Sequence, residues 1–203
     1  MMQRLTLAVA IAALALGSTA GCSRSGGPEG PTPEQIEAER LAAEEARLAA
    51  ERAEAERLAA ERAAAERRAA EAERAETAAA REILEERIHF DYDRSEIRSE
   101  AEQQLMRKLA VLRANPEVRL RIEGHCDERG SIEYNLALGQ RRAEAAVNWL
   151  RGYGISADRL ETVSWGEDRP LVRASNEDAW AMNRRNEFRI IAGGDRLRNP
   201  AGS

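Results

Sequence analysis

The sequence predicts an α+β fold in which a long charged α-helix precedes a two-layer domain, a sheet with helices packed against it. Two observations lead to this prediction. The segment from Pro33 to Arg87 contains 20 Ala, 16 Glu and 10 Arg among its 55 residues, all three strong helix formers. From Ile88 to Gly194, segments that alternate like strands follow segments with helical spacing, which is typical of two packed layers.

The first 21 residues have the three parts of a secretory signal peptide. Arg4 gives a basic start, an apolar run extends from Leu5 to Leu16, and small residues follow. The run is shorter than the roughly 20 apolar residues that span a bilayer. Thr19-Ala20-Gly21-Cys22 resembles a bacterial lipobox, although that motif prefers Leu at the position of Thr19. We therefore expect lipidation of Cys22 and anchoring to a membrane surface.

Residues 22–33 are rich in Gly, Pro and Ser and are expected to form a flexible tether. Residues 34–87 then form a helical spacer, in which many Arg and Glu residues lie three or four positions apart. A weak coiled coil is the alternative, because Leu41, Leu48 and Ala55 follow a heptad. Glu44 and Arg62 interrupt its seam, so a single spacer helix is preferred. The net charge of −5 argues against a general nucleic-acid binder.

The folded domain is predicted over residues 88–194, with residues 195–203 as a flexible tail. Ser99 and Glu102 form a plausible capping box for a helix through Arg113, which Asn115-Pro116 would end. A second helix ends near Trp149 and Leu150. Strands are predicted at residues 87–93, 118–124, 160–166 and 187–193. A short last helix is predicted at residues 176–183.

The stretch "GHCDERG", residues 124–130, concentrates reactive side chains. Metal binding by its four consecutive polar residues, from His125 to Glu128, is not expected because they cannot converge on one ion. A Cys–His nucleophile is also not expected, since neighbours on an extended segment project to opposite sides. Neither a Ser-His-Asp arrangement nor a convincing carboxylate pair is present, so the sequence predicts a binding protein without a cofactor. Cys126 is interpreted as a buried lone thiol.

Asp127 and Arg142 suggest a different use of the same stretch. A carboxylate at Asp127 suits an ammonium group, and the planar fork of Arg142 suits a carboxylate. Together the two side chains would bind a zwitterion. An internal salt bridge between them is the open alternative.

Four motifs carry a family resemblance: "FDYDRSEI", "GHCDERGSIEYNLALGQRRAEAAVNWL", "SWGEDRP" and "NRRNEFRI". In the same order, they resemble the peptidoglycan-associated lipoproteins of the OmpA-like family, over about half of the chain. The resemblance implies a βαβαβ domain that binds the meso-diaminopimelate of peptidoglycan stem peptides noncovalently. It also implies an outer-membrane tether in a Tol-Pal type system, with a TolB-like periplasmic protein as partner. It carries ligand roles onto Asp127 and Arg142, and pocket positions onto Phe90, Asp91, Asn135 and Arg184.

Helix length adds a constraint on this site. In one straight helix from Ser131, Arg142 would lie about 16 Å along the axis, too far from Asp127 to share a ligand. The sequence therefore predicts a break near Gly139 and a new helix from Gln140. Two rival classes share the domain: a flagellar-stator type protein, which would need a membrane helix, and a structural coiled-coil or partner-docking protein.

Overall fold

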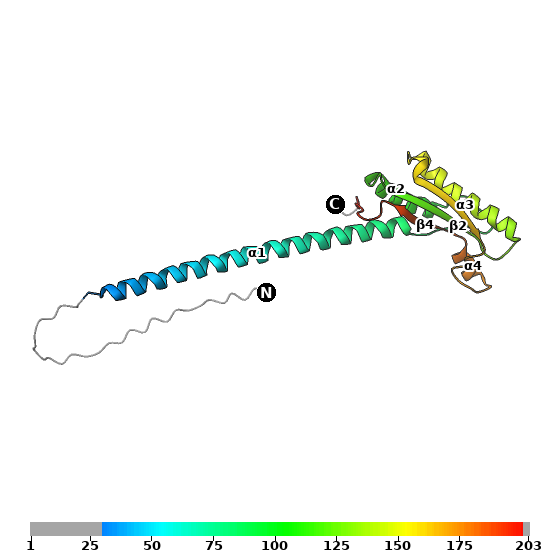
Figure 1. The fold of residues 1–203 in the computed structure, drawn as a ribbon. Coiled ribbons are helices and arrows are strands. Elements are labelled where there is room, and N and C mark those ends of the chain that lie inside the picture. Colours follow the sequence, from blue (N-terminus) through cyan, green and yellow to red (C-terminus); the bar gives the residue numbers. More distant parts are fainter. Residues whose placement is uncertain (1–29, 201–203) are drawn as a thin grey trace, which may run out of the picture. The chain divides into compact units, whose positions relative to one another are not determined.

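The computed structural model describes residues 30–200, so the predicted signal peptide and Cys22 lie outside the described residues. The chain divides into two units, residues 1–58 and 59–203. Helix α1 (Pro33–Glu85) begins in the first unit and ends in the second (Figure 1). At its start, Thr32 Oγ1 accepts from Gln35 N at 3.3 Å and Gln35 Oε1 accepts from Thr32 N at 2.8 Å. Residues 30–58 are all exposed. Within residues 30–200, no helix is both long and apolar enough to cross a membrane.

The second unit is a four-stranded sheet with helices, which confirms the predicted α+β class (Figure 1). The strands lie in the order β1-β4-β2-β3, with β2 and β3 parallel and β4 antiparallel to both of its neighbours. After α1, the elements are β1 (Ile88–His89), α2 (Ser99–Ala114), β2 (Arg119–His125), α3 (Ile132–Gly152), a 3-10 turn (Ala157–Arg159), β3 (Leu160–Gly166), α4 (Glu177–Asn183) and β4 (Arg185–Ala192).

The two faces of the sheet differ in chemistry. Leu120 and Ile122 of β2 and Phe188 of β4 are buried in one core with apolar residues of α2 and α3. Because side chains alternate across a strand, Glu123 and His125 lie on the opposite face. One face is therefore an apolar core, and the other carries acidic, basic and imidazole groups.

Helix α3 is unbroken from Ile132 to Gly152, so the predicted break near Gly139 is wrong. Gly139 has a different function, because it lets the helix approach the sheet. A Cβ at Gly139 would lie 2.4 Å from Ser164 Oγ of β3, and a Cβ at Gly124 of β2 would lie 1.9 Å from the Gly139 carbonyl oxygen. The two glycines thus allow backbone-to-backbone contact between α3 and β2, which larger residues would prevent.

The end of α1 belongs to the folded unit, which therefore begins before the predicted boundary at Ile88. Ala80 and Leu84 are four residues apart on one helical face and are fully buried. The fully buried Lys108 of α2 donates to the carbonyls of Ile83, Leu84 and Glu86 at 2.7, 3.0 and 2.6 Å. It thereby satisfies carbonyls at a helix end that have no partner within the helix.

Two smaller predictions are also corrected. Ser99 is the first residue of α2 rather than its cap, because the helix begins one position earlier, with Arg98 at the N-cap and no side-chain cap bond. The segment after Gly194 is packed as far as it is described and does not form a flexible tail. Leu197 is buried in the core, and the backbone of Arg198 donates to Asn115 Oδ1 at 2.9 Å.

The glycine contact can be tested within one helix. We expect Gly139→Ala to lower the free energy of unfolding by about 2–3 kcal/mol, because the added methyl group overpacks the contact with β2 and β3. Gly152→Ala in the same helix has no atom within 4 Å of the new methyl group and should change stability by less than about 1 kcal/mol. Urea unfolding followed by circular dichroism measures both. Equal effects of the two substitutions would contradict the proposed role of Gly139.

Candidate functional site

A small cavity of about 100 Å³ lies where the segments after β1 and β2 meet helix α3. Five charged side chains line it. Asp93 and Asp127 are acidic, whereas Arg129, Arg142 and Arg184 are basic, so formal charge favours an anionic group by one unit. The remaining lining residues are Tyr92, Cys126, Gly130, Tyr134, Asn135 and Leu138.

The carboxylate of Asp127 is buried and already has two cationic partners. Arg129 donates to it from Nη2 at 2.7 Å and from Nε at 3.3 Å, and Arg184 Nη1 donates at 3.2 Å. Burial opposes ionisation of Asp127, but these hydrogen bonds outweigh it and lower the pKa of the carboxyl group. Asp127 is therefore a fixed negative charge that a ligand ammonium would share with two arginines.

Arg129 is held in place by aromatic rings as well as by charge. Its guanidinium carbon lies 4.0 Å from the ring centroid of Tyr92 and 4.2 Å from that of Trp180 in α4. Its Nη1 also lies 3.5 Å from Glu177 Oε2. Cation–π contacts on two sides and a carboxylate on a third fix the group against the cavity wall.

Arg142 of α3 is fully buried, and the sequence-based alternative of a salt bridge with Asp127 is not observed. Its donors bind backbone carbonyls instead: Nε to Arg94 at 2.8 Å, Nη1 to His125 at 2.8 Å and Nη2 to Asp91 at 3.1 Å. Burial lowers the pKa of this guanidinium, although an arginine remains charged. Arg142 thus joins the segments after β1 and β2 while it lines the cavity.

Asp127 and Arg142 reach one cavity even though α3 is unbroken, which corrects the reasoning from helix length. That reasoning considered only the distance between backbone positions along the helix axis. Side chains of an α-helix point back toward its N-terminus, so the long side chain of Arg142 recovers much of the axial distance.

The four remaining predicted residues fall into two groups. Asn135 and Arg184 line the cavity, and Asn135 Nδ2 lies 2.5 Å from Glu167 Oε2 and 3.2 Å from the Asp127 carbonyl. Phe90 and Asp91 are absent from its lining. The buried Phe90 ring lies under the Arg142 guanidinium at 5.2 Å, and the exposed side chain of Asp91 pairs with Arg98 at 3.6 Å. Phe90 therefore contacts Arg142 through its ring, and Asp91 does so only through its backbone carbonyl.

Cys126 is buried, as expected, and its Sγ lies 3.2 Å from the Asn135 carbonyl and 3.4 Å from Arg142 Nη1. Burial raises the pKa of this thiol to about 11, so it is protonated at neutral pH and a poor nucleophile. It forms part of the cavity wall.

Sequence reasoning missed the aromatic part of the site. Tyr92 and Tyr134 line the cavity, and the Tyr134 hydroxyl donates to Asp93. Trp180 lies 51 positions after Arg129 in the chain, so no local pattern could show that they stack. The available signal was the charge of Arg129 itself, inside the "DERG" stretch.

Comparison with known proteins places the chain in a family. Residues 89–184 match the OmpA family. The peptidoglycan-associated lipoprotein of Brucella melitensis is 45% identical over 100 residues, which cover 49% of this chain and 60% of the relative. That of Haemophilus influenzae is 45% identical over 98 residues, or 48% and 64% of the two chains. The chain therefore spans less than two thirds of these relatives.

A solved structure agrees with the sequence matches. The crystal structure of the peptidoglycan-associated lipoprotein from Burkholderia pseudomallei is 36% identical and superposes with a TM-score of 0.50. The superposition covers 51% of this chain and 88% of that chain. The chain belongs to the OmpA family. The peptidoglycan-associated lipoproteins are among its relatives, which confirms the resemblance carried by the four motifs.

The charge on Asp127 can be tested through the pH dependence of stability. Because the folded state lowers the pKa of Asp127, its ionisation stabilises the fold above the ordinary Asp pKa, and this contribution is lost as the pH falls through the folded-state value. We expect Asp127→Asn to cost about 3 kcal/mol at pH 7, because it leaves Arg184 buried with a weaker partner. The difference from wild type should shrink below about pH 4.

Urea unfolding between pH 2 and 7 measures this effect. Asp195→Asn is the matched control, because Asp195 is exposed. A cost of Asp127→Asn that stays constant over the whole range would contradict the assignment.

Proposed function

We propose that the chain is an outer-membrane lipoprotein that binds peptidoglycan noncovalently and is not an enzyme. The cavity that contains Asp127 and Arg142 is the observation that carries the proposal. Family membership supports it, because the relatives that match this chain are named for association with peptidoglycan.

The ligand is the free end of meso-diaminopimelate in a stem peptide, which carries one ammonium and one carboxylate. Asp127 lies in the cavity wall as a fixed negative charge for the ammonium. Three arginines line the same cavity and supply donors for the carboxylate. A volume of about 100 Å³ accommodates the charged end of a side chain and not a whole sugar, which favours recognition of the stem peptide.

The other segments give this domain its place in the envelope. Lipid on Cys22 anchors the chain to the periplasmic face of the outer membrane, residues 22–33 act as a tether, and the charged helix is a spacer. The domain, with the end of α1 as part of it, then tethers that membrane to the cell wall. A TolB-like periplasmic protein of a Tol-Pal type system is the proposed protein partner.

Binding is tested with ligands that differ in one group. The full chain is titrated with a soluble muropeptide whose stem contains diaminopimelate, and with one whose stem contains lysine, which keeps the ammonium but lacks the carboxylate. We expect saturable binding of the first by calorimetry and about tenfold or weaker binding of the second, because the arginines lose a charged partner. The Arg142→Lys variant should bind the first muropeptide more weakly, since it keeps the charge and loses the fork.

The exposed neighbour Arg141, changed to Lys, is the matched control. Equal affinity for the two muropeptides would rule out recognition of diaminopimelate. No binding of either would leave a partner-docking domain as the better interpretation.

The anchor has its own test. We expect Cys22→Ser to move the protein from the outer-membrane fraction to the soluble periplasmic fraction, because no acyl chain can be attached. Labelled palmitate should be incorporated by the wild type and by Cys126→Ser, but not by Cys22→Ser. Retention of Cys22→Ser in the membrane fraction would show that Cys22 is not the anchor.

A further inference from the structure

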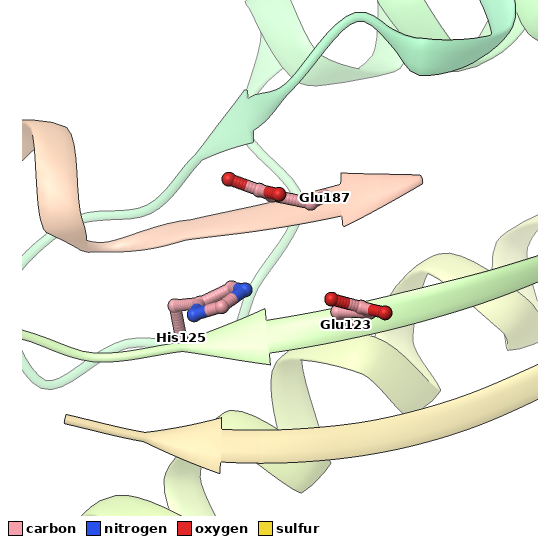
Figure 2. Close-up of side chains that lie close together, drawn as sticks. All are labelled: Glu123, His125 and Glu187. Atoms are coloured by element: carbon pink, nitrogen blue, oxygen red, sulfur yellow. The ribbon is translucent and has the colours of Figure 1, made fainter. Parts of the chain in front are cut away.

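Three side chains of metal-ligand type lie together on the face of the sheet opposite the core. Glu123 and His125 are two residues apart on β2, and Glu187 of β4 is the cross-strand partner of Glu123. One potential ligand atom from each residue lies within 4.8 Å of those from the other two, and Figure 2 shows the side chains on these neighbouring strands. The three residues are only 8%, 2% and 7% exposed, respectively.

The imidazole of His125 is the feature of this cluster that needs an explanation. Neither Nδ1 nor Nε2 has a hydrogen-bond partner within residues 30–200, although both atoms are buried. Buried polar side-chain atoms almost always have a partner, and the exceptions call for a bound ion, an ordered water or a functional role. Here the two unpaired nitrogens lie beside two carboxylates.

Charge gives a second, independent observation. Two glutamates opposite each other on neighbouring strands repel unless a cation compensates them. Glu187 has three such cations, since it accepts from Arg87 at 3.1 Å, Arg185 at 2.9 Å and Arg189 at 2.9 Å. Glu123 instead accepts from the neutral Nε1 of Trp165 at 3.1 Å, and none of the ion pairs found in the described part of the chain involves it. Within residues 30–200, Glu123 therefore has no ion-pair partner of its own, unlike Glu187.

We propose that Glu123, His125 and Glu187 bind a divalent transition-metal ion of the Zn²⁺ type. One imidazole nitrogen and two carboxylate oxygens form a ligand set that such ions accept, with water in the fourth position. A tetrahedral Zn²⁺ with bonds of about 2.0–2.2 Å holds its ligands about 3.4 Å apart, so ligand atoms now up to 4.8 Å apart would close by at most about 1.4 Å. The ion would link β2 to β4.

The sequence-based argument against a metal considered four consecutive residues. The alternation of β2 instead selects residues 123 and 125.

One arginine must release an oxygen of Glu187 before the ion can bind it. Glu187 Oε1 accepts from Arg87 and Arg185, whereas Oε2 accepts from Arg189. The side chain of Arg189 is 57% exposed and that of Arg185 is 4% exposed. Arg189 can therefore turn into solvent and free Oε2 for the ion while Arg185 stays in place. Removing the charge of Arg189 should strengthen metal binding.

The test uses the full chain, freed of metal by dialysis against EDTA and titrated with Zn²⁺ in a calorimeter. We expect one ion per chain, and a change in Trp165 fluorescence because its indole donates to Glu123. His125→Asn and Glu123→Gln should each weaken binding by about tenfold or more, as loss of a ligand does. His89→Asn, at the only other histidine of the chain, is the matched control and should bind like the wild type.

One further variant keeps the proposal open to refutation if a buried substitution disturbs the fold. Arg189→Gln alters an exposed side chain and should bind Zn²⁺ about tenfold more tightly, because a competing positive charge is removed. No saturable Zn²⁺ binding by the wild type, or no gain in Arg189→Gln, would overturn the proposal.

Discussion

The geometry of the candidate site depends on one buried charge, the guanidinium of Arg142. A buried ion costs several kcal/mol unless hydrogen bonds replace its water, and here three backbone carbonyls from two separate segments do so. The carbonyls of Asp91 and Arg94 come from the connection after β1, and that of His125 from the end of β2. Arg142 therefore holds the connection after β1 and the end of β2 together, so that both line the cavity. The same group therefore holds the cavity in shape and contributes a positive charge to its lining.

Asp127 and Arg129 complete the site in a way that limits what can bind. The carboxylate already has two arginine partners, so a cationic group gains less from Asp127 than it would from a free carboxylate. An anionic group meets three arginines in the same small space. A ligand with both charges satisfies both sets at once, whereas a simple cation or anion satisfies one. This balance is what the proposed zwitterionic ligand would require.

Local sequence patterns predicted most of the secondary structure, because strand alternation and helical spacing are short-range properties. The strand at Leu160–Gly166 is found as predicted, and Asn176 caps a helix that ends at Asn183. The errors arise where distant segments meet. Within the sequence of its own helix, a glycine suggests a break. The reason for Gly139 is its close contact with β2, which a local pattern does not show. Leu197 lies in a segment of tail-like composition and is nevertheless part of the core.

The packing of the end of α1 also has a mechanical consequence. Strand β1 has only two residues, so it alone would be a weak connection between a helix and a sheet. The helix end is instead fixed sideways, by Lys108 on its last carbonyls, by Arg81 on the carbonyl of Gly194 at 2.7 Å, and by an ion pair between Glu73 and Arg196 at 2.7 Å. Tension along α1 would therefore meet these contacts before it reached the two-residue pairing of β1 with β4.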